Sequence, residues 1–402
     1  MTFRQVVGKR MYGVLVSFGY VKLRKRLSPI KALVVEYVKN FLIFIGLERL
    51  LLTRVVEIAP HGDPIDGVTE YQVLFKGEEM KFDDERYYHY LRRSPLFGDC
   101  TYRQRDVFVC TIGNAKLDMK TGVICTKDNM LLAESAMEVG RLKISGSYRS
   151  FVPRAKILSG AYATIWGIWG RQHYHWWVDC LPRIYSLKKA GFEDVELLMP
   201  DDLKPYQKES LSYCLPDKMR VRYLAERNWI QVKSVIFPSF VTWKACGFIP
   251  QAHLSYLRER IFEALDVTHD HKYSNRIYIS RSGIHRRRVL NEAELIEYLA
   301  QFGFKSYQPE TLTLEEQVRL FHDADMVVAP HGSALVNLMF SGKIKVLEIF
   351  PIATPETHFF FLSQCLSQEY YYQFHNQRSL HDDFLVDIGE FKKAFSRMIS
   401  DR

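Results

Sequence analysis

The sequence predicts an α/β protein made of two halves with a cleft between them. From residue 163 onward, short apolar runs alternate with segments of helical spacing, and the alternation is clearest after residue 275. Repeated strand–helix units of this size give parallel strands with right-handed crossovers, so the second half is predicted to be doubly wound. Residues 268–274, rich in His and Asp, are the expected linker. Ligands of such sheets bind beyond the carboxyl ends of the strands, which places the expected site between the halves.

The first half starts with a segment unlike the rest of the chain. Residues 1–58 are predicted to form a basic, amphipathic and mostly helical leader. A domain of residues 59–268 follows, rich in short β-like runs as far as residue 151. Apolar, β-branched and aromatic runs predict strands at Tyr71–Phe75, Asp106–Cys110, Gly122–Thr126, Ala163–Trp169, Val195–Met199, Val221–Leu224 and Val232–Phe237. Helical spacing predicts helices at His173–Ala190 and His253–Leu265.

The second half shows the most regular alternation. Strands are predicted at Arg276–Ser280, Lys305–Tyr307, Asp325–Ala329 and Lys345–Ile349. Helices are predicted at Glu292–Phe302 and Leu314–His322, and a further helix is expected to begin near Ser333. Together these elements predict a Rossmann-like domain of residues 275–380, followed by a C-terminal helix within residues 381–402.

The basic charge of the chain is concentrated in the leader. The net charge is +9, from 55 Lys and Arg against 46 Asp and Glu, but the first 31 residues contain eight of the basic residues and no acidic one. The remainder is almost neutral, with 47 basic and 46 acidic residues. A neutral body offers no broad phosphate-binding face, so no nucleic-acid partner is expected. A leader that binds nucleic acid or phosphate by itself is an alternative.

The leader also bears on the expected location. The apolar stretch Met11–Val21 is followed by the basic run Lys22–Arg26 rather than a small-residue cleavage site, which argues against export. Charged residues interrupt Ala32–Leu52, whereas a membrane-spanning helix needs about 20 mainly apolar residues. We expect an interfacial segment that holds a cytoplasmic protein on the cytoplasmic face of an anionic membrane, with an ordinary core helix as the alternative. Seven cysteines without a CxxC pair fit a reducing compartment.

A glycine turn in the second half is the first candidate site. The expected strand ends at Pro330, His331 and Gly332 form the turn, and a helix begins at once. The free N–H groups and positive dipole end of a helix start attract an anion. Gly332 would let a phosphate approach the backbone, Ser333 would cap the helix and donate its hydroxyl, and His331 would add a donor. An ordinary βα turn is the alternative, because neither GxGxxG nor GxxxxGK[ST] is present.

Arginines after the first strand of the second half are the second candidate. Arg281 directly follows the end of that strand, where ligands bind, and its planar fork fits phosphate oxygens. The run Arg286–Arg288 follows shortly afterwards. This run is either a solvated basic loop or a further set of anion-binding side chains near His331.

The predicted helix His173–Ala190 contains the third candidate. Residues four apart share a helix face, so His175, Asp179 and Arg183 are expected to form one polar stripe. His175 is a candidate general base whose ring is oriented by the Asp179 carboxylate. A purely structural histidine is the alternative. The neighbouring Trp176 either packs in the core or stacks on a ligand ring.

Acidic residues of the second half allow two interpretations each. Glu348, in the last predicted strand, either accepts hydrogen bonds from ribose hydroxyls or forms a buried ion pair. Asp323-Ala-Asp325 has the DxD pattern of metal-dependent sugar transferases, but it spans a helix end and a strand start. We interpret it as structural, and no metal site is expected.

Taken together, these motifs resemble the family 61 glycosyltransferases, including bacterial capsular-polysaccharide-type members. Order and spacing are more specific than any single motif, and the match runs from about residue 105 to residue 352. The turn departs from the family pattern, since Gly332-Ser-Ala replaces the commoner Gly-Ala-Gly. The matching motifs are His173-Tyr-His175-Trp-Trp-Val-Asp179-Cys-Leu-Pro182-Arg183, Tyr278-Ile-Ser-Arg281, Arg288-Val-Leu-Asn291-Glu292, Ala324-Asp-Met-Val-Val-Ala-Pro-His331-Gly332-Ser-Ala-Leu-Val-Asn337-Leu and Val346-Leu-Glu348-Ile.

The resemblance implies a GT-B architecture, in which two Rossmann-like halves face a cleft and the C-terminal half holds a nucleotide-sugar donor. It also implies inversion at the anomeric carbon without an essential metal, so no cofactor is expected. The residues expected on the donor side are Arg281, Arg288, His331, Gly332, Ser333, Asn337 and Glu348. Those expected on the acceptor side, in the N-terminal domain, are His173, Trp176 and Arg183.

The sequence therefore predicts an inverting glycosyltransferase of surface polysaccharide biosynthesis. It would move a sugar from a nucleotide-sugar donor to a hydroxyl of a glycan or lipid-linked acceptor. Negative charge builds on the leaving diphosphate, which Arg281, Arg288 and the helix start would stabilise. His175, oriented by Asp179, is the expected base, and Asp179 itself is the alternative. A sugar-nucleotide-binding scaffold without catalysis is the second candidate function.

Overall fold

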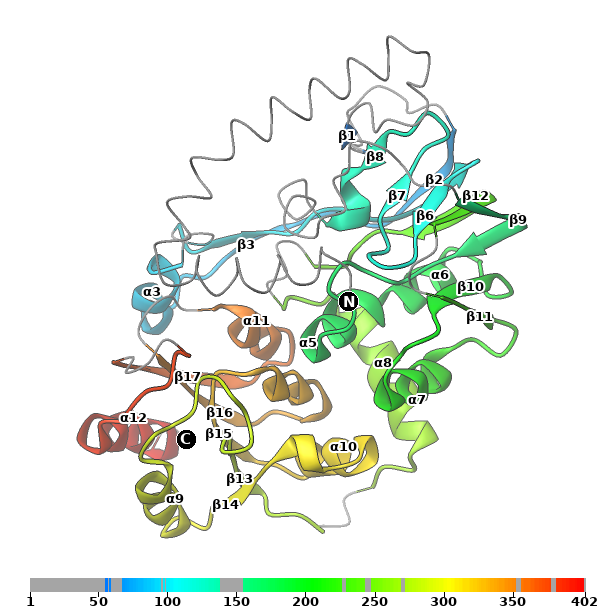
Figure 1. The fold of residues 1–402 in the computed structure, drawn as a ribbon. Coiled ribbons are helices and arrows are strands. Elements are labelled where there is room, and N and C mark those ends of the chain that lie inside the picture. Colours follow the sequence, from blue (N-terminus) through cyan, green and yellow to red (C-terminus); the bar gives the residue numbers. More distant parts are fainter. Residues whose placement is uncertain are drawn as a thin grey trace, which may run out of the picture.

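The computed structural model describes residues 55–56, 58, 67–94, 97, 99–137, 155–225, 229–242, 247–268, 272–351, 356–376 and 381–400. The leader of residues 1–58 thus lies almost wholly outside the described residues, and so do its expected membrane contacts. Over the ranges just given, the protein is a mixed α/β structure with helices packed around two large sheets (Figure 1). No helix in those ranges is both long enough and apolar enough to cross a bilayer.

The N-terminal half is organised around a mixed sheet. In its described part, the main path runs β1-β8-β7-β6-β12-β9-β10-β11, and β2 joins through β5 to β12. Strands β9, β10, β11 and β12 pair in parallel, whereas β2, β5, β6 and β7 pair antiparallel. The strands are β1 Val55–Val56, β2 Val68–Phe75, β5 Val107–Gly113, β6 Lys116–Asp118, β7 Ile124–Cys125, β8 Leu131–Leu132, β9 Ala155–Ala163, β10 Glu196–Pro200, β11 Arg220–Leu224 and β12 Trp229–Pro238. A separate antiparallel pair consists of β3 Glu79–Lys81 and β4 Thr101–Arg103.

The C-terminal half has a parallel sheet with the order β14-β13-β15-β16-β17. The chain runs first to one side of β13 and then to the other, so the strand order reverses between β13 and β15. Ligands of doubly wound folds bind at this switch point. Arg281 comes just after β13 and His331 just after β15, so both lie at the switch point. The strands are β13 Arg276–Ile279, β14 Lys305–Tyr307, β15 Met326–Pro330, β16 Lys345–Pro351 and β17 Glu369–His375.

Helices cover both sheets (Figure 1). The capping box at the start of α10 shows how local sequence sets a boundary: the Thr313 hydroxyl accepts the Glu316 N–H, and the Glu316 carboxylate accepts the Thr313 N–H. The helices of the N-terminal half are α3 Glu85–Arg92, η2 Ala133–Ala136, α5 His173–His175, η3 Trp176–Cys180, α6 Arg183–Lys189, α7 Pro205–Cys214 and α8 Gln251–Ala264. Those of the C-terminal half are α9 Glu292–Ala300, η4 Pro309–Thr311, α10 Leu314–His322, η5 Ser333–Phe340, α11 His358–Cys365 and α12 Ile388–Ser400.

Two predicted elements differ from the structure. The apolar run Ala163–Trp169 is not a strand, because β9 ends at Ala163 and the run continues as a buried loop. The predicted helix His173–Ala190 is broken into α5, the π-helical turn η3 and α6. Pro182, which has no backbone N–H to donate, stands directly before α6.

The two halves share one hydrophobic cluster. The Trp177 ring of η3 lies 5.3 Å from the Phe340 ring of η5. From α8, Arg258 Nη1 donates to the carbonyls of Met339 and Ser341 at 2.8 and 2.6 Å, at the end of η5. Helix α3 also packs against the C-terminal half, where its Tyr90 ring contacts that of Phe350. The cleft between the halves therefore has a continuous core beneath it.

Candidate functional site

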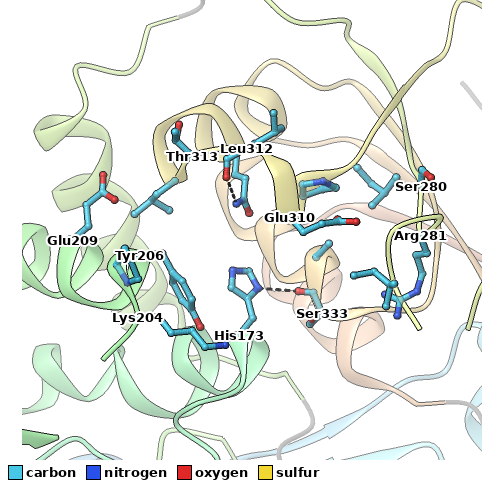
Figure 2. Close-up of a pocket in the computed structure, with 17 residues that line it drawn as sticks. His173, Lys204, Tyr206, Glu209, Ser280, Arg281, Glu310, Leu312, Thr313 and Ser333 are labelled. Atoms are coloured by element: carbon cyan, nitrogen blue, oxygen red, sulfur yellow. Dashed lines mark hydrogen bonds between the residues drawn. The ribbon is translucent and has the colours of Figure 1, made fainter. Parts of the chain in front are cut away.

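A cavity of about 600 Å³ lies at the switch point, between the two halves. Ser280–Arg281 after β13 and Ser333–Ala334 at the start of η5 line it from the C-terminal half. His173 and the start of α7, Lys204–Tyr206, line it from the N-terminal half (Figure 2). This volume falls within the usual range for a small-molecule site, about 300–1,000 Å³.

Arg281 brings a buried positive charge to this cavity. Its side chain is 7% exposed, and Nε and Nη2 donate to the Arg286 carbonyl at 3.3 and 2.9 Å. Within the described ranges, no carboxylate forms an ion pair with it. Burial, followed by the field of Arg287, lowers the pKa of Arg281 to about 10, so it is still protonated near neutral pH. The Glu310 carboxylate of the same cavity acts on Arg281 without forming an ion pair with it. A buried cation without an ion pair favours binding of an anion.

Gly332 makes room for the Arg281 guanidinium. A Cβ at position 332 would lie 1.9 Å from Arg281 Nη1, whereas the extended backbone there (φ −178°) suits any residue. Lack of space, rather than backbone conformation, therefore requires glycine. From the sequence, we expected the space beside Gly332 to admit a phosphate. In the structure, the Arg281 guanidinium occupies that space.

Helix η5 begins at Ser333, but not as predicted. The helix is 3₁₀, its cap residue is Gly332, and no side chain caps it, so the predicted cap by the Ser333 hydroxyl is wrong. Ser333 is exposed and lines the cavity. The first two N–H groups, of Ser333 and Ala334, have no partner within the helix, whereas the Leu335 N–H donates to the Gly332 carbonyl at 3.0 Å. Gly332, directly before them, lies against the Arg281 guanidinium. The helix start thus provides donors to the cavity without a side-chain cap.

His331 and Glu348 form a buried pair behind the turn. His331 Nδ1 lies 2.5 Å from Glu348 Oε1, and the Tyr370 hydroxyl donates to Glu348 Oε2 at 2.6 Å. Tyr370 in turn lies 3.4 Å, oxygen to oxygen, from the Tyr90 hydroxyl of α3. Glu348 is fully buried and both of its oxygens are engaged, so the structure shows the buried pair that was the alternative and leaves no exposed oxygen for a ribose.

Cations surround His331. Burial, followed by the fields of Arg287, His358 and Arg281, lowers its pKa well below the usual range. Burial also raises the pKa of Glu348, so both partners favour their neutral forms. In that state the Glu348 carboxyl donates to Nδ1 and the ring hydrogen lies on Nε2. Nε2 makes no hydrogen bond to a described residue, and His331 is buried behind the turn, outside the lining of the cavity.

Arg287, rather than Arg288, is turned toward this pair. Arg288 is exposed and binds Asp383, with Nη2 2.8 Å from Oδ2, and the structure does not place it in the lining of the cavity with Arg281. Arg287 has a positive φ of 56° and is half-buried, and its Nε has no hydrogen-bond partner. Its charge acts on His331 and Glu348. Arg287 and Arg288 look equivalent in sequence, but the positive φ at Arg287 directs the two side chains to different surroundings.

Asn337 does not reach the cavity. It is fully buried on η5, and its Nδ2 donates to Gln317 Oε1 at 2.9 Å. Gln317 on α10 does line the cavity. The structure therefore does not bring Asn337 to the predicted donor site, and its amide holds the side chain of Gln317.

His173 forms part of the cavity wall. Its Nδ1 lies 3.4 Å from the Ser333 carbonyl, and its Nε2 accepts the indole N–H of Trp177 at 3.1 Å (Figure 2). Both ring nitrogens are thus engaged, with the hydrogen on Nδ1. Burial lowers the pKa of His173 to about 4. The neutral ring joins the two halves at the cavity.

His175 and Asp179 pair as predicted from their spacing. His175 Nδ1 lies 2.6 Å from Asp179 Oδ2, and the Thr242 hydroxyl donates to Asp179 Oδ1 at 2.8 Å. The His175 ring packs 4.7 Å from the Trp169 ring, and its Nε2 has no hydrogen bond to a described residue. The pair borders a separate small cavity, not the large one that Arg281 lines. Trp169 and Thr242 were missed from sequence because neither belongs to the motif.

Trp176 and Arg183 are core residues, and the structure places neither at a cavity wall, where they were predicted to meet an acceptor. The Trp176 indole is fully buried and donates to Ser210 Oγ at 2.9 Å. Arg183 is also fully buried, and its guanidinium donates to the backbone carbonyls of Pro238 and Ile165 at 2.8 and 2.9 Å. The break in the predicted helix explains why Arg183 leaves the face shared by His175 and Asp179.

The acidic DxD pattern lies away from the cavity. Asp325 Oδ2 accepts the Asn275 amide at 2.7 Å, and neither Asp323 nor Asp325 lines the cavity. A search of the described residues finds no group of three or more His, Cys, Asp or Glu side chains placed to hold a metal ion.

Residues 173–347 match the Glycosyltransferase 61 family model. The matched segment contains the His175–Asp179 pair, Arg281 and the His331–Ser333 turn. It begins at the cavity wall of the N-terminal half and ends within β16, so it covers the elements that form the cavity.

Named relatives agree with this match. Protein O-linked-mannose beta-1,4-N-acetylglucosaminyltransferase 2 of Mus musculus is 34% identical over 134 residues, 29% of this chain and 23% of the relative. The Canis lupus familiaris protein of that name is 41% identical over 80 residues, 18% of this chain and 13% of the relative. The chain spans less than a quarter of the length of these curated relatives. The family match and the relatives support a glycosyltransferase, and hence an enzyme.

Proposed function

We propose that the protein is an inverting glycosyltransferase of GT-B architecture that uses a nucleotide-sugar donor. The observation that carries this proposal is the cavity at the switch point, where Arg281 forms no ion pair with a described residue and the start of η5 offers free N–H groups. The two halves on either side of the cavity, and the family match across it, support the same assignment. An essential metal is not part of the proposal, in line with the sequence resemblance.

The donor is proposed to lie with its nucleoside in the cavity and its diphosphate at the turn. Apolar side chains, among them Ile279 and Leu312, line the nucleoside region, and Glu310 offers a carboxylate to hydroxyl donors. Arg281 and the first N–H groups of η5, which line the cavity, would hold the diphosphate, and His331 would support the turn from behind. Arg287 replaces Arg288 as the second arginine acting at this point.

The reaction follows from where charge develops. The acceptor oxygen attacks the anomeric carbon as the bond to the diphosphate oxygen breaks, so the sugar moves with inversion and the nucleoside diphosphate leaves. Fixed cations and N–H groups at the leaving diphosphate stabilise the negative charge that builds there. His175 Nε2 would accept the proton of the acceptor hydroxyl, because Asp179 holds Nδ1–H and orients the ring.

Donor binding tests the proposal first. We expect a panel of nucleotide sugars in a thermal-shift experiment to contain a clear best stabiliser, since a ligand stabilises by RT ln(1 + [L]/Kd). By calorimetry, Arg281→Ala should weaken that donor roughly 10- to 100-fold, the range for hydrogen bonds to a charged group. The matched control is Arg288→Ala, which removes an equal charge outside the cavity and should leave affinity unchanged. Equal affinity for wild type and Arg281→Ala would mean that the diphosphate lies elsewhere.

The substrates are proposals drawn from three sources. The names of the relatives make an N-acetylglucosamine nucleotide the first donor to test. A glycan or lipid-linked acceptor, and a place in bacterial surface or capsular polysaccharide synthesis, rest on the sequence resemblance alone, since the relatives named above are vertebrate proteins. The basic leader is proposed to hold the protein peripherally on the cytoplasmic face of a membrane.

A sugar-nucleotide-binding scaffold without transfer is the second candidate. One observation favours it: the His175–Asp179 pair borders a different cavity from the one that Arg281 lines. Donor hydrolysis in the absence of acceptor decides between the two. Hydrolysis that depends on His175 supports an enzyme, and tight donor binding without any turnover supports the scaffold.

A further inference from the structure

A second cavity, of about 420 Å³, lies at the opposite edge of the C-terminal sheet. It is bounded by α3, the edge strand β17 and α12. Three strand spacings separate β17 from β13, which is about 15 Å in a sheet. This cavity is therefore distinct from the one proposed for the donor.

Four tyrosines form the walls of this second cavity. Tyr87 and Tyr370 are buried at its floor, and Tyr371 and Tyr372 are partly exposed at its sides. The Tyr372 hydroxyl donates to the Arg86 carbonyl at 3.2 Å, so that ring is fixed in place. Rigid tyrosine rings bind flat ligands at a low cost in side-chain entropy, and their apolar faces suit the C–H faces of a sugar ring.

Two arginines give the cavity a positive charge. Arg86 is paired with Asp84, with Nη2 2.6 Å from Oδ2. Arg397 on α12 forms no ion pair with a described residue, and none of the cavity's described lining residues is acidic. One guanidinium thus remains without a counter-ion, and its planar fork matches a singly charged, planar carboxylate.

We propose that this cavity binds a uronate-bearing saccharide, with its carboxylate on Arg397 and a sugar ring against the tyrosines. The choice of a saccharide rests on the proposed function, while the charge and shape of the cavity stand without it. Strand addition by a peptide is disfavoured, because α3 lies against this edge, where the Tyr372 hydroxyl of β17 donates to the Arg86 carbonyl. A glycan that occupies this cavity would be held on the enzyme apart from the transfer site.

Calorimetry on the full chain tests the site with defined probes. We expect a tetrasaccharide of alternating glucuronate and N-acetylglucosamine to bind at least tenfold tighter than the neutral tetrasaccharide of N-acetylglucosamine. Arg397→Ala should weaken the acidic tetrasaccharide at least tenfold, and Arg397→Lys should fall between it and wild type. The matched control is Lys393→Ala on the same helix, whose ammonium is paired with Glu390 and which does not line the cavity.

The outcomes separate this site from the donor site. Equal binding of the acidic and neutral probes, unchanged binding by Arg397→Ala, or no saturable binding of the acidic probe at millimolar concentration each overturns the proposal. Free glucose 6-phosphate and free glucuronate are compared as single sugars. Tighter binding of glucose 6-phosphate than of glucuronate overturns the carboxylate assignment. Nucleotide affinity is measured on the same samples and should not change in Arg397→Ala. If no nucleotide sugar binds while the acidic tetrasaccharide does, the proposed function fails and this site stands.

Discussion

Each half of the molecule contains a histidine that holds a carboxylate on Nδ1 and leaves Nε2 without a hydrogen bond to a described residue. In the N-terminal half, His175 pairs with Asp179 at 2.6 Å, and in the C-terminal half His331 pairs with Glu348 at 2.5 Å. Both pairs are buried. In isolation the two arrangements would be expected to behave alike.

Their surroundings differ in charge. The Thr242 hydroxyl donates to Asp179, and an aromatic ring, Trp169, packs on His175. The His331 pair instead faces cations, and burial favours its neutral state. We propose that the first pair accepts a proton, whereas the cations beside the second pair favour an anion at the turn. The same local pair thus suits two different tasks.

The largest expected effect is on turnover at the first pair. His175→Ala should lower kcat about 100- to 10,000-fold, the range for loss of a general base, with little change in donor affinity. Asp179→Asn should also slow the reaction, because the ring loses the carboxylate that orients it. Initial rates of transfer to a confirmed acceptor provide the measurement, with donor affinity by calorimetry as the control. Near-wild-type rates in both variants would show that neither residue is the base.

The next effect is on stability at low pH, through His173. Its pKa is about 4 in the folded protein and about 6.5 in an unfolded chain, so the unfolded state binds the extra proton between these values. The stability that the neutral ring provides is complete above about pH 6.5 and is lost as the pH falls, by about 3 kcal/mol below pH 4.

Urea unfolding at several pH values between 7 and 4 measures this loss. His173→Asn keeps a donor for the Ser333 carbonyl but does not titrate, so its free energy of unfolding should fall less steeply with decreasing pH. His89→Asn removes an exposed histidine and should keep the wild-type slope. Identical slopes for His173→Asn and wild type would assign the acid sensitivity to other groups.

The third prediction concerns donor affinity and the space at Gly332, next to the His331–Glu348 pair. In Gly332→Ala the new Cβ would lie 1.9 Å from Arg281 Nη1, so the guanidinium must move. We expect donor affinity to fall roughly 10-fold, or about 1.4 kcal/mol. Gly342→Ala is the matched control, because a Cβ there meets nothing within 4 Å. The double variant with Arg281→Ala should bind no more weakly than Arg281→Ala alone, and full additivity would contradict this mechanism.

The smallest expected effect is on stability and donor affinity when Tyr370, the hydrogen-bond partner of Glu348, is changed. Tyr370→Phe removes the hydroxyl that donates to Glu348, which should lower the free energy of unfolding by about 1 kcal/mol. Donor affinity should fall only a few-fold, because His331 keeps its carboxyl partner. Tyr371→Phe is the control, since its hydroxyl binds the exposed Glu369 at 3.2 Å. A larger loss in Tyr371→Phe than in Tyr370→Phe would show that the buried link to Glu348 contributes little.

The two histidine–carboxylate pairs also show which features the sequence could predict and which it could not. The regular alternation of the second half predicted β13 to β16 and the helices between them, because each unit is amphipathic by itself. Strand β17 was missed, since its Tyr-Tyr-Tyr run has no alternation of apolar and polar residues. Spacing alone predicted the His175–Asp179 pair, because residues four apart meet on a helix.

Other site features depend on contacts distant in sequence. Nothing local distinguishes Arg287 from Arg288, which differ only through a positive φ at the first. The sequence around Trp176 does not show whether its ring stacks on a ligand or, as the structure has it, lies in the core and donates to Ser210. The partner of Glu348, Tyr370, lies 22 residues away and its next neighbour, Tyr90, 280 residues further toward the N-terminus. Such pairings are settled by tertiary packing, which periodicity does not encode.

The core beneath the cleft has a thermodynamic consequence. Because Arg258 of α8 satisfies the last carbonyls of η5, and Trp177 packs on Phe340, each half supplies surface that the other needs to bury. We therefore expect loss of structure in one half to remove support from the other. The molecule should therefore melt in one cooperative transition, and exchange of ligands should depend on local movement of the loops at the cavity rim rather than on hinging of two independent bodies.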